Sequence, residues 1–81
     1  MMFFVYVIGS KKKLKLTTYV GYTNNIEKRL NLHNSGKGAK FTRGRRWKLM
    51  YLEKYKTKKE AILREYYIKK NRKFRNTIKS K

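Results

Sequence analysis

Three side chains with complementary chemistry lie between residues 19 and 33. Arg29 and His33 are four residues apart, so they lie side by side on the surface of any helix that contains both. Tyr19 precedes that helix at the end of a predicted strand. A guanidinium binds phosphate oxygens in pairs, and a histidine or tyrosine can transfer a proton. The set suits cleavage of a phosphodiester bond, in which charge builds on the phosphate while a water loses its proton.

The acidic residues limit the kind of metal site that the chain can form. Its 81 residues include 4 carboxylate side chains, all Glu, against 24 Lys and Arg. A two-metal nuclease site needs several carboxylates, so this chain can hardly build one. A single Mg²⁺ can be held by one carboxylate when phosphate oxygens and waters complete its ligands.

Glu65 is the acid to which the local structure gives no task. Glu27 and Glu60 fall in the first turns of predicted helices, where a negative charge suits the dipole, and Glu53 lies late in a predicted strand. On a helical wheel Glu65 falls within the apolar arc, which consists of Ala61, Ile62 and Ile68. A carboxylate there is costly unless it is paired or binds a ligand, so Glu65 either pairs with a neighbouring Lys or Arg or holds a metal.

The charge predicts the partner. A net charge of +20 repels itself in a compact chain, and nucleic acid is the polyanion that usually relieves such repulsion. The acid-free segment of residues 35–46 is the expected contact, through Lys37, Lys40, Arg43, Arg45 and Arg46. The alternative is a lysine-rich surface that is only solvated.

Composition excludes several classes of protein. The absence of Cys excludes disulfides and thiolate zinc sites, and no apolar run is long enough to span a membrane. The apolar residues 1–8 lack a basic n-region and a cleavage site, so they are not a signal peptide. We expect one cytoplasmic, monomeric domain over residues 1–81, with a core over about 3–70 and a basic tail over 71–81.

The predicted elements form an α+β domain. Residues 3–8 form an apolar central strand, and a turn over residues 9–15 joins it to a second strand over 16–21. A helix over about 25–34 begins at an N-cap, Asn24, with Glu27 completing a capping box.

The second half follows the same logic. A third strand over 47–55 has one face made of Trp47, Leu49, Tyr51 and Tyr55, and the other made of Met50 and Leu52. Thr57 and Glu60 form a capping box for a helix over about 58–71. The tail, with Phe74 and Ile78 four apart, suggests a short third helix.

The ordered motifs resemble the GIY-YIG nuclease superfamily, and especially its small stand-alone bacterial members. Two strand motifs stand here as Val5-Tyr6-Val7 and Tyr19-Val20-Gly21. They are followed by the run EKRLNLHNSGKGAKFTR over residues 27–43 and by REYYIKK over residues 64–70. The tripeptides alone are weak signals, but the ordered set is specific and covers residues 3–70.

The resemblance implies a three-stranded antiparallel sheet flanked by helices, and hydrolysis of DNA with one divalent metal, Mg²⁺ or Mn²⁺. By position, Tyr6 and Tyr19 would be the motif tyrosines, with Tyr6 the preferred general base. Arg29 would steady the phosphate, His33 would assist proton transfer or position a water, and Glu65 would hold the metal. A free tyrosine is a poor base at neutral pH, but a metal and many cations would favour its phenolate.

Some assignments stay open. Tyr6, Tyr19 and His33 could instead be structural members of the core. The family often uses an asparagine after the metal glutamate, for which Asn71 and Asn76 are both candidates. The Gly and Ile of the first motif are both Val here, which suits a strand.

Three functions follow from these expectations. The first is a metal-dependent endonuclease in DNA repair, recombination or nucleic-acid processing. The second is a non-catalytic DNA- or RNA-binding module on a nuclease scaffold. The third, suggested by size and basicity alone, is a ribosome-associated structural protein.

Overall fold

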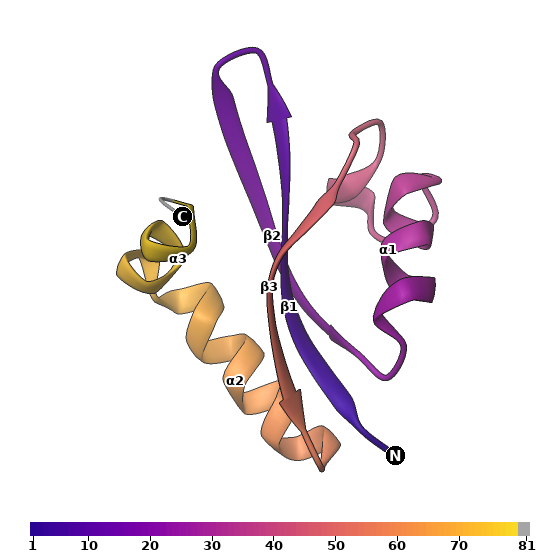
Figure 1. Ribbon diagram of the computed structural model, residues 1–81, viewed down its shortest axis with the longest axis vertical. Helices are drawn as coiled ribbons and strands as arrows, with labels where there is room; N and C mark the ends of the chain where they lie inside the picture. The colour runs from indigo at the N-terminus through magenta and orange to yellow at the C-terminus, as the bar shows by residue number, and fades with distance from the viewer. Residues whose placement is uncertain (80–81) are drawn as a thin grey trace.

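The computed structural model describes residues 1–79 and has three layers (Figure 1). The middle layer is an antiparallel sheet in the order β2-β1-β3, made of β1 (Phe3–Lys12), β2 (Lys15–Thr23) and β3 (Lys48–Tyr55). Helix α1 (Ile26–Asn34) covers one face, and α2 (Lys58–Lys70) and α3 (Arg72–Lys79) cover the other. A short 3₁₀ helix, η1 (Lys40–Thr42), precedes β3. The predicted α+β fold is confirmed, while residues 80 and 81 of the predicted tail lie outside the described residues.

The hairpin turn is not where the sequence suggested. Gly9 and Ser10 do not open it, because β1 continues to Lys12 and the connection consists of Lys13 and Leu14 alone. Gly9 serves packing instead, since a Cβ at this position would lie 2.2 Å from the Met50 sulfur. A residue type common in turns is here required by close contact between strands β1 and β3.

The ends of α1 are fixed by local hydrogen bonds. Its N-cap is Asn25, whose side chain accepts from the Lys28 N–H at 3.1 Å, so the predicted capping box of Asn24 and Glu27 is wrong. At the other end the Lys37 N–H donates to the Leu32 carbonyl at 2.9 Å, and Gly36 has a φ of 81°. This turn ends the helix at Asn34, as predicted.

A β-bulge in β3 explains a second correction. Val7 pairs with Tyr51 but Ile8 pairs with Leu49, so Met50 is an extra residue in the strand. As a result Trp47 packs on the α1 side with Tyr6 and Ile8, while Met50, Tyr51 and Tyr55 pack on the α2 side. The single predicted face of Trp47, Leu49, Tyr51 and Tyr55 is therefore wrong.

Glu53 anchors α2 to the sheet, a role that its position in the sequence did not reveal. Its carboxylate accepts from Arg64 Nε at 2.8 Å and Nη2 at 2.9 Å, from Tyr55 at 2.6 Å, and from the Tyr51 hydroxyl. The Arg64 guanidinium also lies 5.0 Å from the centre of the Phe74 ring, which belongs to α3. The pair of Glu53 and Arg64 thus joins β3, α2 and α3.

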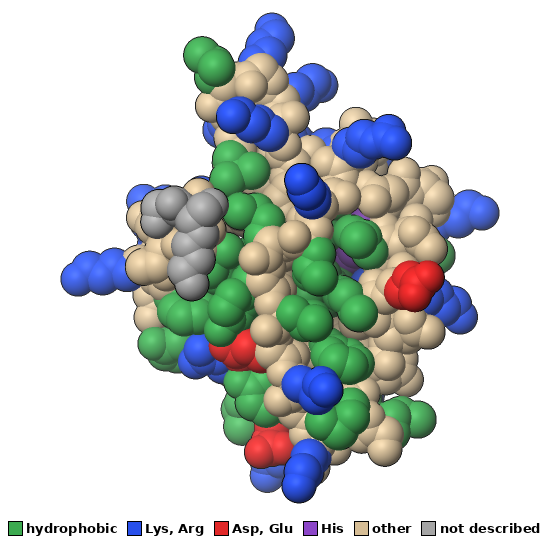
Figure 2. All heavy atoms as spheres, in the orientation of Figure 1, with side chains coloured by type: hydrophobic (Ala, Val, Ile, Leu, Met, Phe, Trp, Pro, Cys, Tyr) green, Lys and Arg blue, Asp and Glu red, His purple; other side chains and the backbone are tan. Residues whose placement is uncertain are grey.

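The surface matches the composition. Lys and Arg side chains project around the outline of the face shown in Figure 2, and hydrophobic side chains gather over β3 and its border with α2 and α3. Within residues 1–79, no helix has both the length and the apolar character needed to cross a bilayer.

Candidate active site

A cleft of about 470 Å³ opens at the free edge of β2. Because β2 is an edge strand, side chains from both faces of the sheet can meet there. Its functional lining consists of Tyr6, Tyr19, Gly21, Arg29, Lys58 and Glu65. These residues bring two tyrosines, two cations and one carboxylate together from β1, β2, α1 and α2, and a third tyrosine, Tyr22, also lines the cleft.

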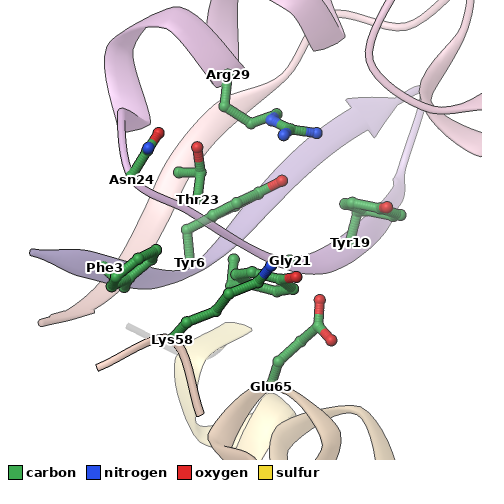
Figure 3. A pocket seen from close by; sticks show the side chains of 10 residues that line it. Phe3, Tyr6, Tyr19, Gly21, Thr23, Asn24, Arg29, Lys58 and Glu65 are labelled. Carbon is green, nitrogen blue, oxygen red and sulfur yellow. The ribbon is translucent and has the colours of Figure 1, made fainter. Parts of the chain in front are cut away.

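The three layers approach the cleft from different sides (Figure 3). Tyr6 pairs with Gly21 across β1 and β2, and α1 supplies Arg29 above them. Glu65 rises from α2 below, with its carboxylate pointing toward the strand edge. Four of the five predicted catalytic residues thus line one cleft, which spacing along the sequence alone could not establish.

His33 is the exception, because it lies behind Tyr6 and does not line the cleft. The ring is only 1% exposed, and its Nε2 lies 2.8 Å from the Tyr6 hydroxyl. Its Nδ1 lies 2.9 Å from Thr42 Oγ1, which also lies 2.9 Å from the Ala39 carbonyl. Tyr6 can donate to Nε2, Nδ1–H to Thr42, and Thr42 to the Ala39 carbonyl. With these directions, each hydrogen in the three consecutive hydrogen bonds has an acceptor.

Burial keeps both members of the pair neutral. It raises the pKa of Tyr6, Tyr19 adds to the rise, and the nearby Arg29 charge opposes it without prevailing. Arg29 thus favours the Tyr6 phenolate, but its charge alone does not outweigh burial. Burial, and secondarily Arg29, lowers the pKa of His33. A neutral imidazole thus faces a protonated phenol, which suits the transfer of a proton from Tyr6 to His33.

Two glycines fit closely around this pair. A Cβ on Gly21 would lie 2.4 Å from the Tyr6 hydroxyl, and a Cβ on Gly38 would lie 2.4 Å from His33 Nδ1. Both targets are ends of buried rings rather than of flexible chains, so an added methyl would displace them. The sequence assigned Gly21 only to the end of a strand, but the glycine lies within β2 and leaves room for Tyr6.

The structure gives Glu65 an ion-pair partner and also places it in the cleft. Its carboxylate lines the cleft and also lies 3.7 Å from the Lys69 ammonium, one helical turn away. Residues 1–79 contain no group of three or more His, Asp or Glu that could hold a metal by themselves. One carboxylate in a cleft with cations fits a single hard ion that takes its remaining ligands from phosphate and water, and does not fit a two-metal centre.

The other predicted residues lie away from the cleft. Asn71 donates to the Tyr67 hydroxyl at 2.9 Å and accepts from the Phe74 N–H at 2.9 Å, so it fixes the junction of α2 and α3. Asn76 is exposed on α3. The acid-free segment of residues 35–46, called the basic loop below, contributes none of its five cations to the lining of the cleft. Arg45 is half-buried and the other four are exposed, namely Lys37, Lys40, Arg43 and Arg46.

Two residues of the site were missed from the sequence. Lys58 lines the cleft from the start of α2, but one lysine among so many carries no signal. Thr42 orients His33, and its place in the motif run of residues 27–43 could have drawn attention to it. Its backbone carbonyl accepts from Trp47 Nε1 at 2.9 Å, so the loop that carries Thr42 is tied to the core.

Replacing Thr42 with valine is expected to change the tautomer of His33. Valine keeps the volume but removes the acceptor for Nδ1–H, so the proton moves to Nε2 and Tyr6 becomes the acceptor. Because the chain has 1 histidine, the ¹⁵N shifts of its ring nitrogens report the tautomer directly. Thr42→Ser should keep the wild-type shifts. Identical shifts in the valine variant would show that Thr42 does not select the tautomer.

Comparison with known proteins agrees with this arrangement. The sequence model of the GIY-YIG catalytic domain family matches residues 2–79 of this chain. A UPF0213 protein of Clostridium perfringens is 51% identical over 70 residues, which cover 85% of this chain and 72% of the relative. A UPF0213 protein of Bacillus licheniformis is 64% identical over 53 residues, 64% of this chain and 55% of the relative. The solution NMR structure of a UPF0213 protein of Bacillus halodurans has a TM-score of 0.57 and 35% identity, and the match covers 99% of this chain and 84% of that one. With this cleft and this match along its length, the chain belongs to the GIY-YIG catalytic domain family, alongside the small bacterial UPF0213 proteins.

Proposed function

We propose that the protein is a divalent-metal-dependent endonuclease that hydrolyses phosphodiester bonds in DNA. The observation that carries this proposal is the cleft at the β2 edge, where Tyr6, Arg29 and Glu65 meet from three elements. The relatives are bacterial, so we place the activity in the cytoplasm, in DNA repair, recombination or other nucleic-acid processing.

Each cleft residue has a distinct task in the proposed reaction. Arg29 and Lys58 bind the non-bridging phosphate oxygens. The Tyr6 oxygen takes a proton from the attacking water while its own proton passes to His33 Nε2, so that no free phenolate is needed. The water oxygen bonds to phosphorus, the bond to the leaving oxygen breaks, and that oxygen takes a proton from solvent. Glu65 would hold one Mg²⁺ or Mn²⁺, which supplies charge stabilisation at the phosphate.

The test is incubation of the purified protein with labelled duplex, single-stranded and branched DNA and with RNA, each with and without Mg²⁺ or Mn²⁺. We expect metal-dependent cleavage of at least one DNA. If only RNA is cleaved, the substrate is RNA and the proposal of DNA as substrate is wrong.

A second candidate is a non-catalytic DNA- or RNA-binding module. The ion pair of Glu65 with Lys69 at 3.7 Å favours it, because a carboxylate that is already paired needs no metal. Binding of all nucleic acids without cleavage of any, in either metal, would establish this module and reject the nuclease.

Binding itself is expected to depend on phosphate contacts made by the basic loop. Arg43→Ala and Arg45→Ala should each weaken binding about equally for all sequences, and each should reduce the slope of log affinity against log salt by about 1. Fluorescence anisotropy between 50 and 300 mM salt measures the slope. A nearly salt-independent affinity of the wild type would contradict this prediction.

A further inference from the structure

The β1–β2 hairpin extends beyond the sheet as a two-stranded arm, residues 10–17. Strand β3 pairs with β1 no further than Gly9 opposite Lys48, whereas β1 and β2 stay paired as far as Lys12 opposite Lys15. Figure 1 shows this end of the hairpin standing clear of the three helices. Arg45 of the basic loop donates to Thr17 Oγ1 at 3.4 Å, so the loop and the arm adjoin.

The sequence of the arm is poorly suited to stability alone. Lys12 and Lys15 lie directly opposite each other, and like charges so placed destabilise a sheet. Lys13 has a φ of 58°, a turn conformation for which glycine or asparagine is usual. Leu14 is 96% exposed at the tip. The like-charge pair, the unusual turn conformation and the exposed leucine are each unfavourable for folding. Their occurrence together at one place indicates a role in binding.

The chemistry of the arm suits DNA. Residues 10–17 contain no acid and present four exposed lysines, Lys11, Lys12, Lys13 and Lys15. Lys and Arg side chains surround this end of the molecule in Figure 2. Lysines bind phosphates whatever the sequence, while an exposed leucine can contact bases in a groove or enter between them.

The position of the arm relative to the cleft sets the spacing of the two contacts. Leu14, in the turn at the tip of the arm, precedes the cleft residue Tyr19 of strand β2 by five positions. At about 3.3 Å per residue, the tip lies roughly 17 Å from the cleft. Since a DNA duplex rises 3.4 Å per base pair, this is about five base pairs.

We propose that the arm is a second binding site for the DNA that occupies the cleft. Its lysines bind phosphates about five base pairs from the bond that is cut, and Leu14 contacts the bases there. The inference rests on the proposed function for the occupant of the cleft, but its test measures binding and does not require cleavage.

The first measurement compares two triple variants of equal charge. The arm variant carries Lys11→Gln, Lys12→Gln and Lys13→Gln. The control variant carries Lys54→Gln, Lys56→Gln and Lys59→Gln, exposed lysines at or near the opposite end of β3. Affinity is measured by anisotropy over a range of salt, without divalent metal, for a 24-base-pair duplex and for a DNA hairpin with a four-base-pair stem, too short to join the cleft and the arm.

On the long duplex the arm variant should bind about 10- to 100-fold more weakly than wild type at 0.1 M salt, and its salt slope should fall by about 2 to 3. On the short stem the slope should fall by less than about 1, and the control variant should change little on either DNA. Equal losses in both variants, or equal losses on both DNAs, would overturn the arm as a distinct site.

Leu14→Ser separates the base contact from the charge. It should weaken binding to the long duplex several-fold at every salt concentration while leaving the slope unchanged, because no phosphate contact is lost. Unchanged affinity would overturn the role of Leu14. If the arm effects are present but the wild type cuts nothing, the arm stands and the nuclease proposal fails.

Discussion

Glu65→Ala is expected to abolish DNA cleavage, with a fall in rate of about 10³-fold or more, while folding and DNA binding remain nearly intact. Glu65 is the carboxylate that lines the cleft, so its removal leaves a single metal ion without a protein ligand. Its pairing with Lys69 is a contact between neighbouring turns at 3.7 Å and is partly exposed, so the loss should cost less than about 1 kcal/mol of stability. Single-turnover cleavage in Mg²⁺ and thermal unfolding provide the two readouts.

Two control variants separate the metal role from a structural one. Glu60→Ala removes the other carboxylate of α2, which accepts from Thr57 at 3.0 Å in the cap, and should cost about 1 kcal/mol without loss of cleavage. Lys69→Ala removes the partner of Glu65 and should also leave cleavage intact. Cleavage by Glu65→Ala at the wild-type rate would refute the metal assignment. Unfolding of both Glu65→Ala and Lys69→Ala would identify the pair as structural.

Acid is expected to destabilise the fold through Glu53. Burial opposes ionisation of Glu53, but the hydrogen bonds from Arg64, Tyr51 and Tyr55 prevail and lower its pKa to about 2 from an ordinary value of 4.5. A depressed carboxyl pKa gives stability that is fully present above about pH 4.5 and is lost as the pH falls toward 2. The difference corresponds to about 3 kcal/mol, which is large for a domain of this size.

Glu53→Gln tests this contribution. At pH 7 the variant should unfold in urea with a free energy about 3 kcal/mol lower than wild type, and the difference should shrink to near zero at pH 2. Protonation of His33 also costs stability in acid, but it occurs in both proteins and cancels from the difference. Glu27→Gln, at an exposed acid in the first turn of α1, is the matched control and should change little. A difference that stays constant from pH 7 to pH 2 would show that Glu53 gives no pH-dependent stability.

The sequence predicted the parts of the site that depend on residue type and local spacing. Arg29 and His33 are one turn apart on a helix. Glu65 stands out because the other acids lie in the first turns of helices or in a strand. The sequence did not show that His33 lies behind Tyr6, because that depends on how α1 packs on the sheet. The order of the motif residues along the chain thus indicates the chemistry, but not which of them reaches the cleft.

Three features misread from the sequence share one physical cause, which is contact between residues far apart in the chain, whereas the N-cap of α1 is set locally. Glu53 seemed unremarkable because its partner Arg64 lies on another element. The bulge at Met50 cannot be seen in an alternating pattern, since the extra residue is itself apolar. Gly9 was assigned to a turn on residue type, although the approach of Met50 is what requires a glycine there.

The position of β1 between β2 and β3 has a consequence for the order of folding. Tyr6, His33, Thr42 and Trp47 all lie within the first 47 residues, and the β1–β2 pairing is local along the chain. The β1–β3 pairing joins Phe3 to Tyr55 and must close a much longer loop. Local contacts form faster than distant ones, so Tyr6 and His33 can pair early in folding. Glu65 reaches the cleft only after β3 has paired with β1 and α2 has packed on the sheet. Catalytic competence would then be the last property that the chain acquires as it folds.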